Sequence, residues 1–288
     1  MSYKVDPQAV DKMEEECGIF GIYAPGHEVA NRTVFALQAL QHRGQEAAGI
    51  AVGANYTITV EKDLGLVTQV FDNNSISVLE GDLAIGHVRY STSGSKMAWE
   101  ASQPHISAIG EVLIALAHNG TLINTEKILN SLVRQGIKML SSTDSEVASK
   151  LIALETVKTN RLRDGIAAMM NQIKGAYAMV LCTPDSLYAF RDPYGIRPLS
   201  LGKMDDGCWV VASETCAFDI IGAEFVRDVK PGEIIRVNKD GLDSRMGSHA
   251  KEHTMCVFEY VYFARPDSYI DEQNVYDARF RMGKTLAK

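Results

Sequence analysis

The chain has 288 residues, of which 46% are hydrophobic and 23% are charged, and its formal net charge is −7. These proportions are typical of a soluble globular protein with one large domain, or one domain and part of a second. The acidic balance argues against a nucleic-acid-binding protein. No stretch approaches the roughly 20 apolar residues that span a membrane.

The N-terminus and the cysteines indicate a cytoplasmic protein. Residues 1–6 lack the apolar region of a secretory signal. The five cysteines are widely spaced and form no CxxC pair, which is typical of reduced thiols. Residues 1–16 are polar and acidic, and we expect them to be a removable leader, or propeptide. Cleavage after Glu16 would make Cys17 the first residue of the mature chain.

From Cys17 onward the hydrophobic pattern predicts two groups of strands with helices between and around them. A strand opens this part, and a helix is expected to begin at Asn31 and end at Gly44. Further strands are predicted at 48–52, 56–60, 83–90, 112–118, 176–182, 187–191, 199–201, 209–213 and 233–237. Helices are predicted at 123–134, 162–173 and from a capping box at Thr143 and Glu146 to about residue 156. We therefore expect an α+β fold of two antiparallel sheets packed face to face, with helices outside.

The end of the chain has a different pattern. Residues 255–263 are rich in aromatic and β-branched side chains and are predicted to form a strand, whereas residues 275–288 follow a helical pattern without a C-cap. We expect residues 17–250 to form one domain. Residues 251–288 are expected to be the start of a second, truncated domain.

Cys17 is the first candidate for chemistry. A free thiol has a pKa of about 8.5 and a free α-amine about 7.7–8.0, so an N-terminal cysteine carries its own base. Before cleavage that amine is an amide, and activity would depend on removal of the leader. The alternative for Cys17 is a buried strand residue, the commoner fate of a lone cysteine.

Other polar segments follow predicted strands or open predicted helices. Asn119 and Gly120 could form an oxyanion hole from a side-chain amide and a backbone N–H, although Asn-Gly is also a common hairpin turn. Arg89 could bind a carboxylate or form a surface salt bridge. Asp144 could bind an ammonium group, stabilise a helix N-terminus, or both. A nucleophile, an oxyanion hole and two charged clamps together suit the cleavage of an amino-acid side-chain amide.

These segments resemble the class II glutamine amidotransferases. The resemblance rests on residues 17–22, 40–50, 86–92, 117–120 and 142–146. Within that class it is closer to the amidophosphoribosyltransferase family, on residues 191–199, 212–218, 229–233 and 259–268. The resemblance runs from Cys17 to the end of the chain in the same order. It implies an N-terminal-nucleophile hydrolase fold, a four-layer αββα sandwich.

The resemblance implies a role for each matching residue. Cys17 would be the nucleophile, and Asn119 with the Gly120 N–H would form the oxyanion hole. The glutamine α-carboxylate would be held by Arg89 and its α-amine by Asp144. Further substrate-site residues would be Thr92 and Arg43, the latter in the polar segment 41–46 that could line a pocket or stabilise the fold. Glutamine would be hydrolysed through a thioester on Cys17.

The resemblance also implies partners and cofactors. The ammonia would reach phosphoribosyl pyrophosphate on a transferase domain and give 5-phosphoribosylamine, the first committed step of purine biosynthesis. The paired acidic residues and phosphate loop of that domain are missing from this sequence, so we expect glutaminase activity alone. Mg²⁺ and purine nucleotide inhibitors would bind the missing domain, and the full-length protein would be a homo-oligomer.

An iron–sulfur cluster is a further implication for the full-length protein. Some relatives with a leader hold a [4Fe–4S] cluster, and Cys256 is at the position of its first ligand. One cysteine cannot hold a cluster, so the other ligands would lie beyond Lys288. We expect no cofactor in the glutaminase domain itself.

Two other functions remain open from the sequence. The chain could be the glutaminase domain of another amidotransferase such as glutamate synthase, although residues 260–268 argue against it. It could instead be a non-catalytic interaction module with the same fold.

Overall fold

The computed structural model describes residues 17–90, 99–249 and 252–288. Within these ranges most strands belong to two sheets in which every neighbouring pair is antiparallel. The first sheet runs, in spatial order, β11 (Ala223–Asp228), β9 (Ser200–Met204), β10 (Trp209–Ala212), β1 (Gly18–Tyr23), β4 (Leu83–Arg89), β2 (Ala47–Ala54), β3 (Thr57–Leu64). The second runs β13 (Gly241–Met246), β12 (Glu233–Asn238), β8 (Leu187–Arg191), β7 (Gly175–Cys182), β6 (Val112–Leu122), β5 (His105–Ile109).

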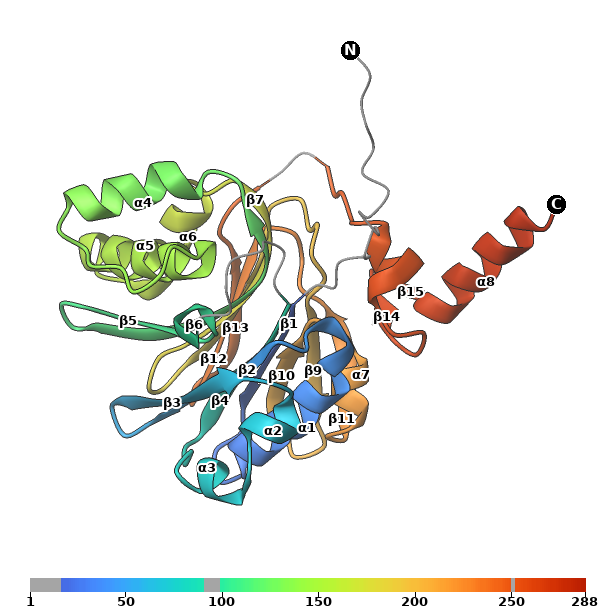
Figure 1. The fold of residues 1–288 in the computed structure, drawn as a ribbon, viewed down its shortest axis with the longest axis horizontal. Helices are drawn as coiled ribbons and strands as arrows, with labels where there is room; N and C mark the ends of the chain where they lie inside the picture. Colours follow the sequence, from blue (N-terminus) through green and yellow to red (C-terminus); the bar gives the residue numbers. More distant parts are fainter. Residues whose placement is uncertain (1–16, 91–98, 250–251) are drawn as a thin grey trace, which may run out of the picture.

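Helices cover the outer face of each sheet (Figure 1). On the first sheet these are α1 (Val29–Ala39), α2 (Val67–Val70) and α7 (Cys216–Asp219), and on the second α4 (Thr125–Arg134), α5 (Asp144–Thr159) and α6 (Leu162–Met170). The short helices α3 (Asn73–Ser77), η1 (Gln41–Arg43) and η2 (Trp99–Ala101) lie in connections. The predicted αββα sandwich is confirmed.

Strand alternation divides the apolar side chains among three cores. In β1, Phe20 faces the helix layer and Ile19 faces the other sheet. In β6, Leu116 packs under the helices, whereas Ala117 lies between the sheets. Alanines also occupy other inward positions of the second sheet, and such small side chains let the sheets approach closely. The close approach brings the ends of β1 and β6 together.

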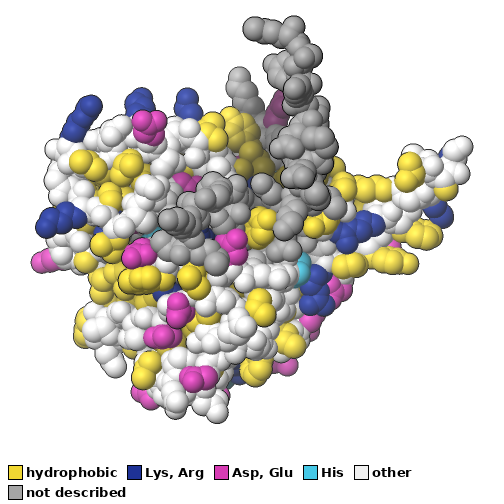
Figure 2. Space-filling model, viewed as in Figure 1, with side chains coloured by type: hydrophobic (Ala, Val, Ile, Leu, Met, Phe, Trp, Pro, Cys, Tyr) yellow, Lys and Arg dark blue, Asp and Glu magenta, His cyan; other side chains and the backbone are white. Residues whose placement is uncertain are grey.

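The C-terminal segment has its own small core. It contains the π-helix η3 (Glu259–Phe263), the hairpin β14 (Tyr269–Ile270) and β15 (Gln273–Asn274), and the helix α8 (Val275–Leu286). Tyr260, Ala264, Ile270, Val275 and Ala278 form this core. Figure 1 shows α8 projecting away from the sandwich, and Figure 2 shows hydrophobic side chains along this projecting arm. The exposed ones include Tyr276, Phe280 and Leu286.

Several local predictions need correction. The predicted strand at 255–263 is helical, and the Ala264 N–H donates to the Glu259 carbonyl at 3.0 Å. Asn31 lies inside α1 rather than at its cap, and its amide donates to Glu28. The predicted capping box is half formed, because Thr143 accepts from the Glu146 N–H but the Glu146 carboxylate binds the Leu140 and Ser141 N–H groups. Strands β5, β11 and β13 were not predicted.

Candidate active site

Cys17 lies in the first sheet's layer, directly before β1. Gly18 pairs with Val88 of β4, so continuation of the register places Cys17 opposite Arg89. The Cys17 side chain is partly exposed, and its Sγ lies 3.7 Å from the Tyr90 carbonyl oxygen. Arg89 is also partly exposed. The nucleophile candidate and the carboxylate-binding candidate are therefore adjacent.

Asn119 and Gly120 lie within β6 of the opposite sheet. They are not a hairpin turn, because the strand continues to Leu122 and pairs with β7 throughout. Gly120 has φ +140°, and a Cβ there would lie 2.1 Å from the Ala176 carbonyl oxygen. Only glycine allows β7 to pass this closely. The turn alternative is wrong.

The Ser213 hydroxyl connects the two candidates. It accepts a hydrogen bond from the Ile19 N–H at 3.0 Å and lies 3.5 Å from Asn119 Nδ2. Ser213 follows β10 and is fully buried. Because Ile19 is two residues from Cys17, this hydroxyl brings strand β1, which follows Cys17, and the Asn119 amide to the same point between the sheets.

The edge of β6 turns several N–H groups toward one side. The His118 N–H donates to Gln103 Oε1 at 2.7 Å, and the Leu122 N–H donates to Asp144 Oδ2 at 3.0 Å. Alternation along an antiparallel strand places the Gly120 N–H on the same edge, between these two. Asn119 is fully buried, and its Oδ1 has no hydrogen-bond partner among the described residues. Its amide has two N–H groups, of which Ser213 accounts for one. Two donors can therefore converge beside Cys17.

Asp144 begins helix α5 close to this edge. Its side chain is 26% exposed, and its Oδ1 lies 3.9 Å from His118 Nδ1. Both roles expected from the sequence are compatible with this position, because the carboxylate lies in the first helical turn and is partly open to solvent. Asp144 therefore joins Cys17, Arg89, Asn119 and Gly120 in one region.

Buried histidines form the scaffold under the site. His87 Nε2 donates to the His118 carbonyl at 3.2 Å, which links β4 to β6. Burial lowers the pKa of His87 far below its ordinary value, and burial with nearby Lys62 lowers the pKa of His105 to about 3. Burial also lowers the pKa of His118, although the charge of Asp144 opposes the shift. These imidazoles are therefore neutral near pH 7.

Arg43 is buried in an ionic cluster rather than facing a substrate. Its Nη1 donates to Glu214 and Glu259, its Nη2 donates to Glu259, and its Nε donates to the Cys17 carbonyl at 3.1 Å. Burial alone would lower the pKa of Arg43, but the two carboxylates raise it. For Glu214, burial would raise the pKa, but the charges of Arg43 and His42 hold it at about 2. The cluster therefore holds the backbone carbonyl of Cys17.

Three residues of this region were not singled out from the sequence. Ser213 contacts strand β1, which follows Cys17, and Glu214 and Glu259 contact Arg43, which binds the Cys17 carbonyl. The signal available for the first two was a Ser-Glu pair directly after an apolar strand. Glu259 lay inside a segment predicted to be a strand and gave no such signal. Thr92 lies outside the described residues, as do residues 1–16.

The part of the chain that the structure describes holds one group of potential metal ligands. There, only His27, Asp206 and Cys208 bring three candidate ligand atoms within 4.8 Å of one another. Arg32 donates to His27 Nδ1, so Nε2 carries the proton that it shares with Asp206 at 3.1 Å. The imidazole lone pair is therefore already used. Cys256 is partly exposed and belongs to no such group, so the iron–sulfur cluster stays a prediction for a longer chain.

Residues 87–219 match the protein family described as "Glutamine amidotransferase domain". A relative from Synechocystis sp., named amidophosphoribosyltransferase, is 45% identical over 96% of this chain and 57% of its own length. The chain belongs to the glutamine amidotransferase family. It spans a little over half the length of the curated relatives it matches.

Solved structures support the same placement. The glutamine phosphoribosylpyrophosphate amidotransferase of Bacillus subtilis, in a complex with ADP and GMP, has a TM-score of 0.86 and 42% identity. The match spans 94% of this chain and 58% of the Bacillus subtilis chain. A second structure, described as the allosteric regulatory enzyme of purine biosynthesis, has a TM-score of 0.87 and 42% identity, over 94% of this chain and 57% of its own. This chain therefore has the N-terminal-nucleophile hydrolase fold that was expected from the sequence. Among the described residues, no helix is both long and apolar enough to cross a membrane.

Proposed function

We propose that this chain hydrolyses glutamine with Cys17 as the nucleophile once residues 1–16 have been removed. The freed α-amine takes the thiol proton, and the thiolate attacks the side-chain amide carbon of glutamine. Asn119 Nδ2 and the Gly120 N–H stabilise the oxyanion. The intermediate expels ammonia, which carries away the transferred proton, and leaves a glutamyl thioester. Water then attacks the thioester and releases glutamate.

Charged residues on either side of Cys17 would orient the substrate. Arg89 lies opposite Cys17 at the end of β4 and would pair with the α-carboxylate of glutamine. Asp144 lies beside the Leu122 N–H and would accept the α-ammonium group. Thr92 stays a predicted further contact. Arg43 supports the site through the Cys17 carbonyl instead of binding substrate.

The observation that carries this proposal is the bridge made by Ser213. Its hydroxyl links the Ile19 N–H of one sheet to the Asn119 amide of the other. This contact holds the Asn119 amide near the strand that follows Cys17, as an oxyanion hole for a Cys17 nucleophile requires. The names of the relatives support the same activity and favour it over a glutaminase domain of glutamate synthase.

The role in a larger protein is a further part of the proposal. Relatives of greater length are named amidophosphoribosyltransferase, so we infer that the ammonia serves the conversion of phosphoribosyl pyrophosphate to 5-phosphoribosylamine in purine biosynthesis. We propose that this step takes place on a transferase domain with Mg²⁺. The paired acidic residues and phosphate loop expected of that domain are missing from the 288-residue sequence. Purine nucleotide inhibitors are proposed because a matched solved structure holds ADP and GMP. Homo-oligomer assembly is proposed from the family resemblance, and a cytoplasmic location from the N-terminus and the widely spaced cysteines.

A paired assay tests both parts. The 288-residue chain should release glutamate and ammonia from glutamine, and Cys17→Ser should lower that rate by at least about 10³-fold, because the hydroxyl is a far weaker nucleophile. The same preparation should form no phosphoribosylamine from phosphoribosyl pyrophosphate. A folded chain without glutaminase activity would support the interaction module instead. Formation of phosphoribosylamine would refute the limit to glutaminase activity.

A further inference from the structure

Two buried arginines of the sandwich bind carboxylates from the C-terminal segment. Arg43 holds both oxygens of Glu259, with Nη–O distances of 3.0 and 2.9 Å. Arg191 holds both oxygens of Asp271, at 3.0 and 3.0 Å. Each arginine is 1% exposed. The segment 252–288 is therefore attached to the sandwich at two bidentate ion pairs of the same geometry.

The two arginines differ in what else they hold. The Nε of Arg43 donates to the Cys17 carbonyl. The remaining contacts of Arg191 go to the carbonyls of Arg197, Val229 and Gly195, outside the nucleophile's strand. A guanidinium is planar and its donors point in fixed directions. Glu259 binds both Nη atoms of Arg43, whereas Glu214 binds only Nη1. The position of the Glu259 carboxylate therefore helps to set the direction in which Nε donates to the Cys17 carbonyl.

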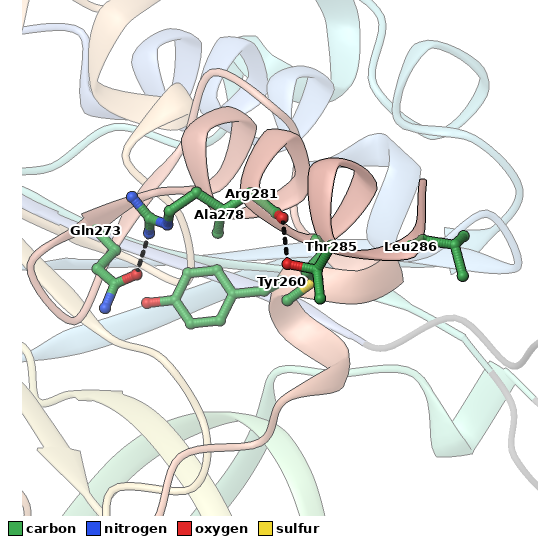
Figure 3. Close-up of a pocket in the computed structure, with 7 residues that line it drawn as sticks. Tyr260, Gln273, Ala278, Arg281, Thr285 and Leu286 are labelled. Carbon is green, nitrogen blue, oxygen red and sulfur yellow. Dashed lines mark hydrogen bonds between the residues drawn. The ribbon is translucent and has the colours of Figure 1, made fainter. Parts of the chain in front are cut away.

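Glu259 is in turn held by elements of its own segment. It opens η3, whose carbonyl at Tyr260 and the following carbonyl at Ala264 each accept a hydrogen bond of 2.7 Å from Arg279 of α8. The Tyr260 hydroxyl donates to the Ile270 carbonyl at 2.6 Å. Figure 3 shows the Tyr260 ring beneath α8, beside Gln273 and Ala278. A continuous set of contacts therefore leads from α8 through Glu259 and Arg43 to the nucleophile.

We propose that Glu259 is a positioning residue for Cys17 and acts through Arg43. This inference rests on the proposed glutaminase function. With Glu259 in place, the Cys17 backbone is held so that the thiol meets the substrate carbonyl beside Asn119 and Gly120. A shift of about 1 Å in a reacting group can cost on the order of 10²-fold in rate. Docking of the C-terminal segment thus completes the amidotransferase site.

Matched variants of the 288-residue chain test the proposal. Glu259→Gln and Asp271→Asn each neutralise one of the two bidentate pairs, so both should lower the thermal unfolding midpoint. Glu259→Gln should also lower kcat for glutamine by about 10- to 100-fold with little change in KM. Asp271→Asn should stay within about threefold of the unmodified chain in both constants.

A second pair on α8 keeps the test valid if Glu259→Gln fails to fold. Arg279→Gln removes the hydrogen bonds that hold η3, whereas Arg281→Gln removes a side-chain hydrogen bond with Gln273. The first should lower kcat without raising KM, and the second should leave kcat unchanged. A double variant tests whether Glu259 acts through Arg43. In an Arg43→Lys background, Glu259→Gln should cause little further loss of kcat.

The outcomes separate this inference from the function on which it rests. Equal loss of kcat in the Glu259 and Asp271 variants, or full activity in Glu259→Gln, would overturn the positioning role while the unmodified chain stays active. An unmodified, processed chain that neither hydrolyses glutamine nor reacts at Cys17 would overturn the proposed function and this inference together.

Discussion

The two sides of the proposed site differ in how completely their polar groups are paired. On the Cys17 side, Arg43, Glu214 and Glu259 are buried and satisfied by one another. On the β6 side, Asn119 Oδ1 is buried without a hydrogen-bond partner among the described residues. The charged groups on the Cys17 side are paired with one another, as in a structural cluster. The β6 side keeps a buried oxygen, Asn119 Oδ1, that has no partner among the described residues.

This difference indicates what each side contributes. A buried polar atom left unpaired costs about 1–3 kcal/mol, so such atoms persist mainly where a ligand or a reaction uses the group. A buried ion pair, by contrast, is strongly destabilising to break. Substitutions on the β6 side should therefore reduce activity more than stability, and substitutions in the Arg43 cluster should reduce stability.

Apart from substitution of Cys17 itself, Asn119→Ala should have the largest effect on activity. Loss of one oxyanion-hole donor typically lowers kcat by about 10²–10³-fold. The unfolding midpoint should change little, because the bond between the Asn119 amide and Ser213 is long, at 3.5 Å, and therefore weak. Steady-state kinetics with thermal unfolding would measure both quantities. A large stability loss with normal kcat would contradict the assignment of the β6 side.

Glu214→Gln should have the largest effect on stability. The pKa of Glu214 is about 2, below the ordinary value of 4.5, so its charge stabilises the folded state above about pH 4.5. That contribution, on the order of 3 kcal/mol, is lost as the pH falls from about 4.5 to about 2. Denaturant unfolding at several pH values should show the gap between the original chain and the variant closing over this window. A gap that is constant with pH would contradict this account.

Asp144→Asn should have a smaller and more selective effect. The asparagine oxygen can still accept the Leu122 N–H, so the fold should be kept. Loss of a charged hydrogen bond to the α-ammonium group should raise KM for glutamine by about tenfold or more. An analogue without the α-amino group serves as the control, and its kcat/KM should not change. Equal losses for both substrates would assign Asp144 to the helix N-terminus alone.

Much of the fold could be predicted because the hydrophobic pattern is local. Short, nearly continuous apolar runs identified β6, β7 and β8, since these strands bury one face under helices and the other between the sheets. Strand β13 escaped prediction because most of its residues are polar and partly or fully exposed. The αββα arrangement followed from the order of elements.

Site residues could be predicted from the sequence only where the side chain itself indicates a chemical role. Cys17, Arg89, Asn119 and Asp144 have side chains whose uses are recognisable, and the structure brings them together. Glu259 could not be found this way, because its partner Arg43 lies 216 positions earlier in the chain. Glu259 also lies in a helical segment, although the local β propensity of residues 255–263 predicted a strand.

The role of Cys17 as the nucleophile can be tested by mass spectrometry of the chain before and after reaction with an electrophilic glutamine analogue. We expect loss of residues 1–16 and then one adduct, mapped to Cys17 and formed more slowly in an Arg89→Gln variant. A processed chain that gains no adduct at Cys17, or an adduct at another cysteine with Cys17 unmodified, would contradict it.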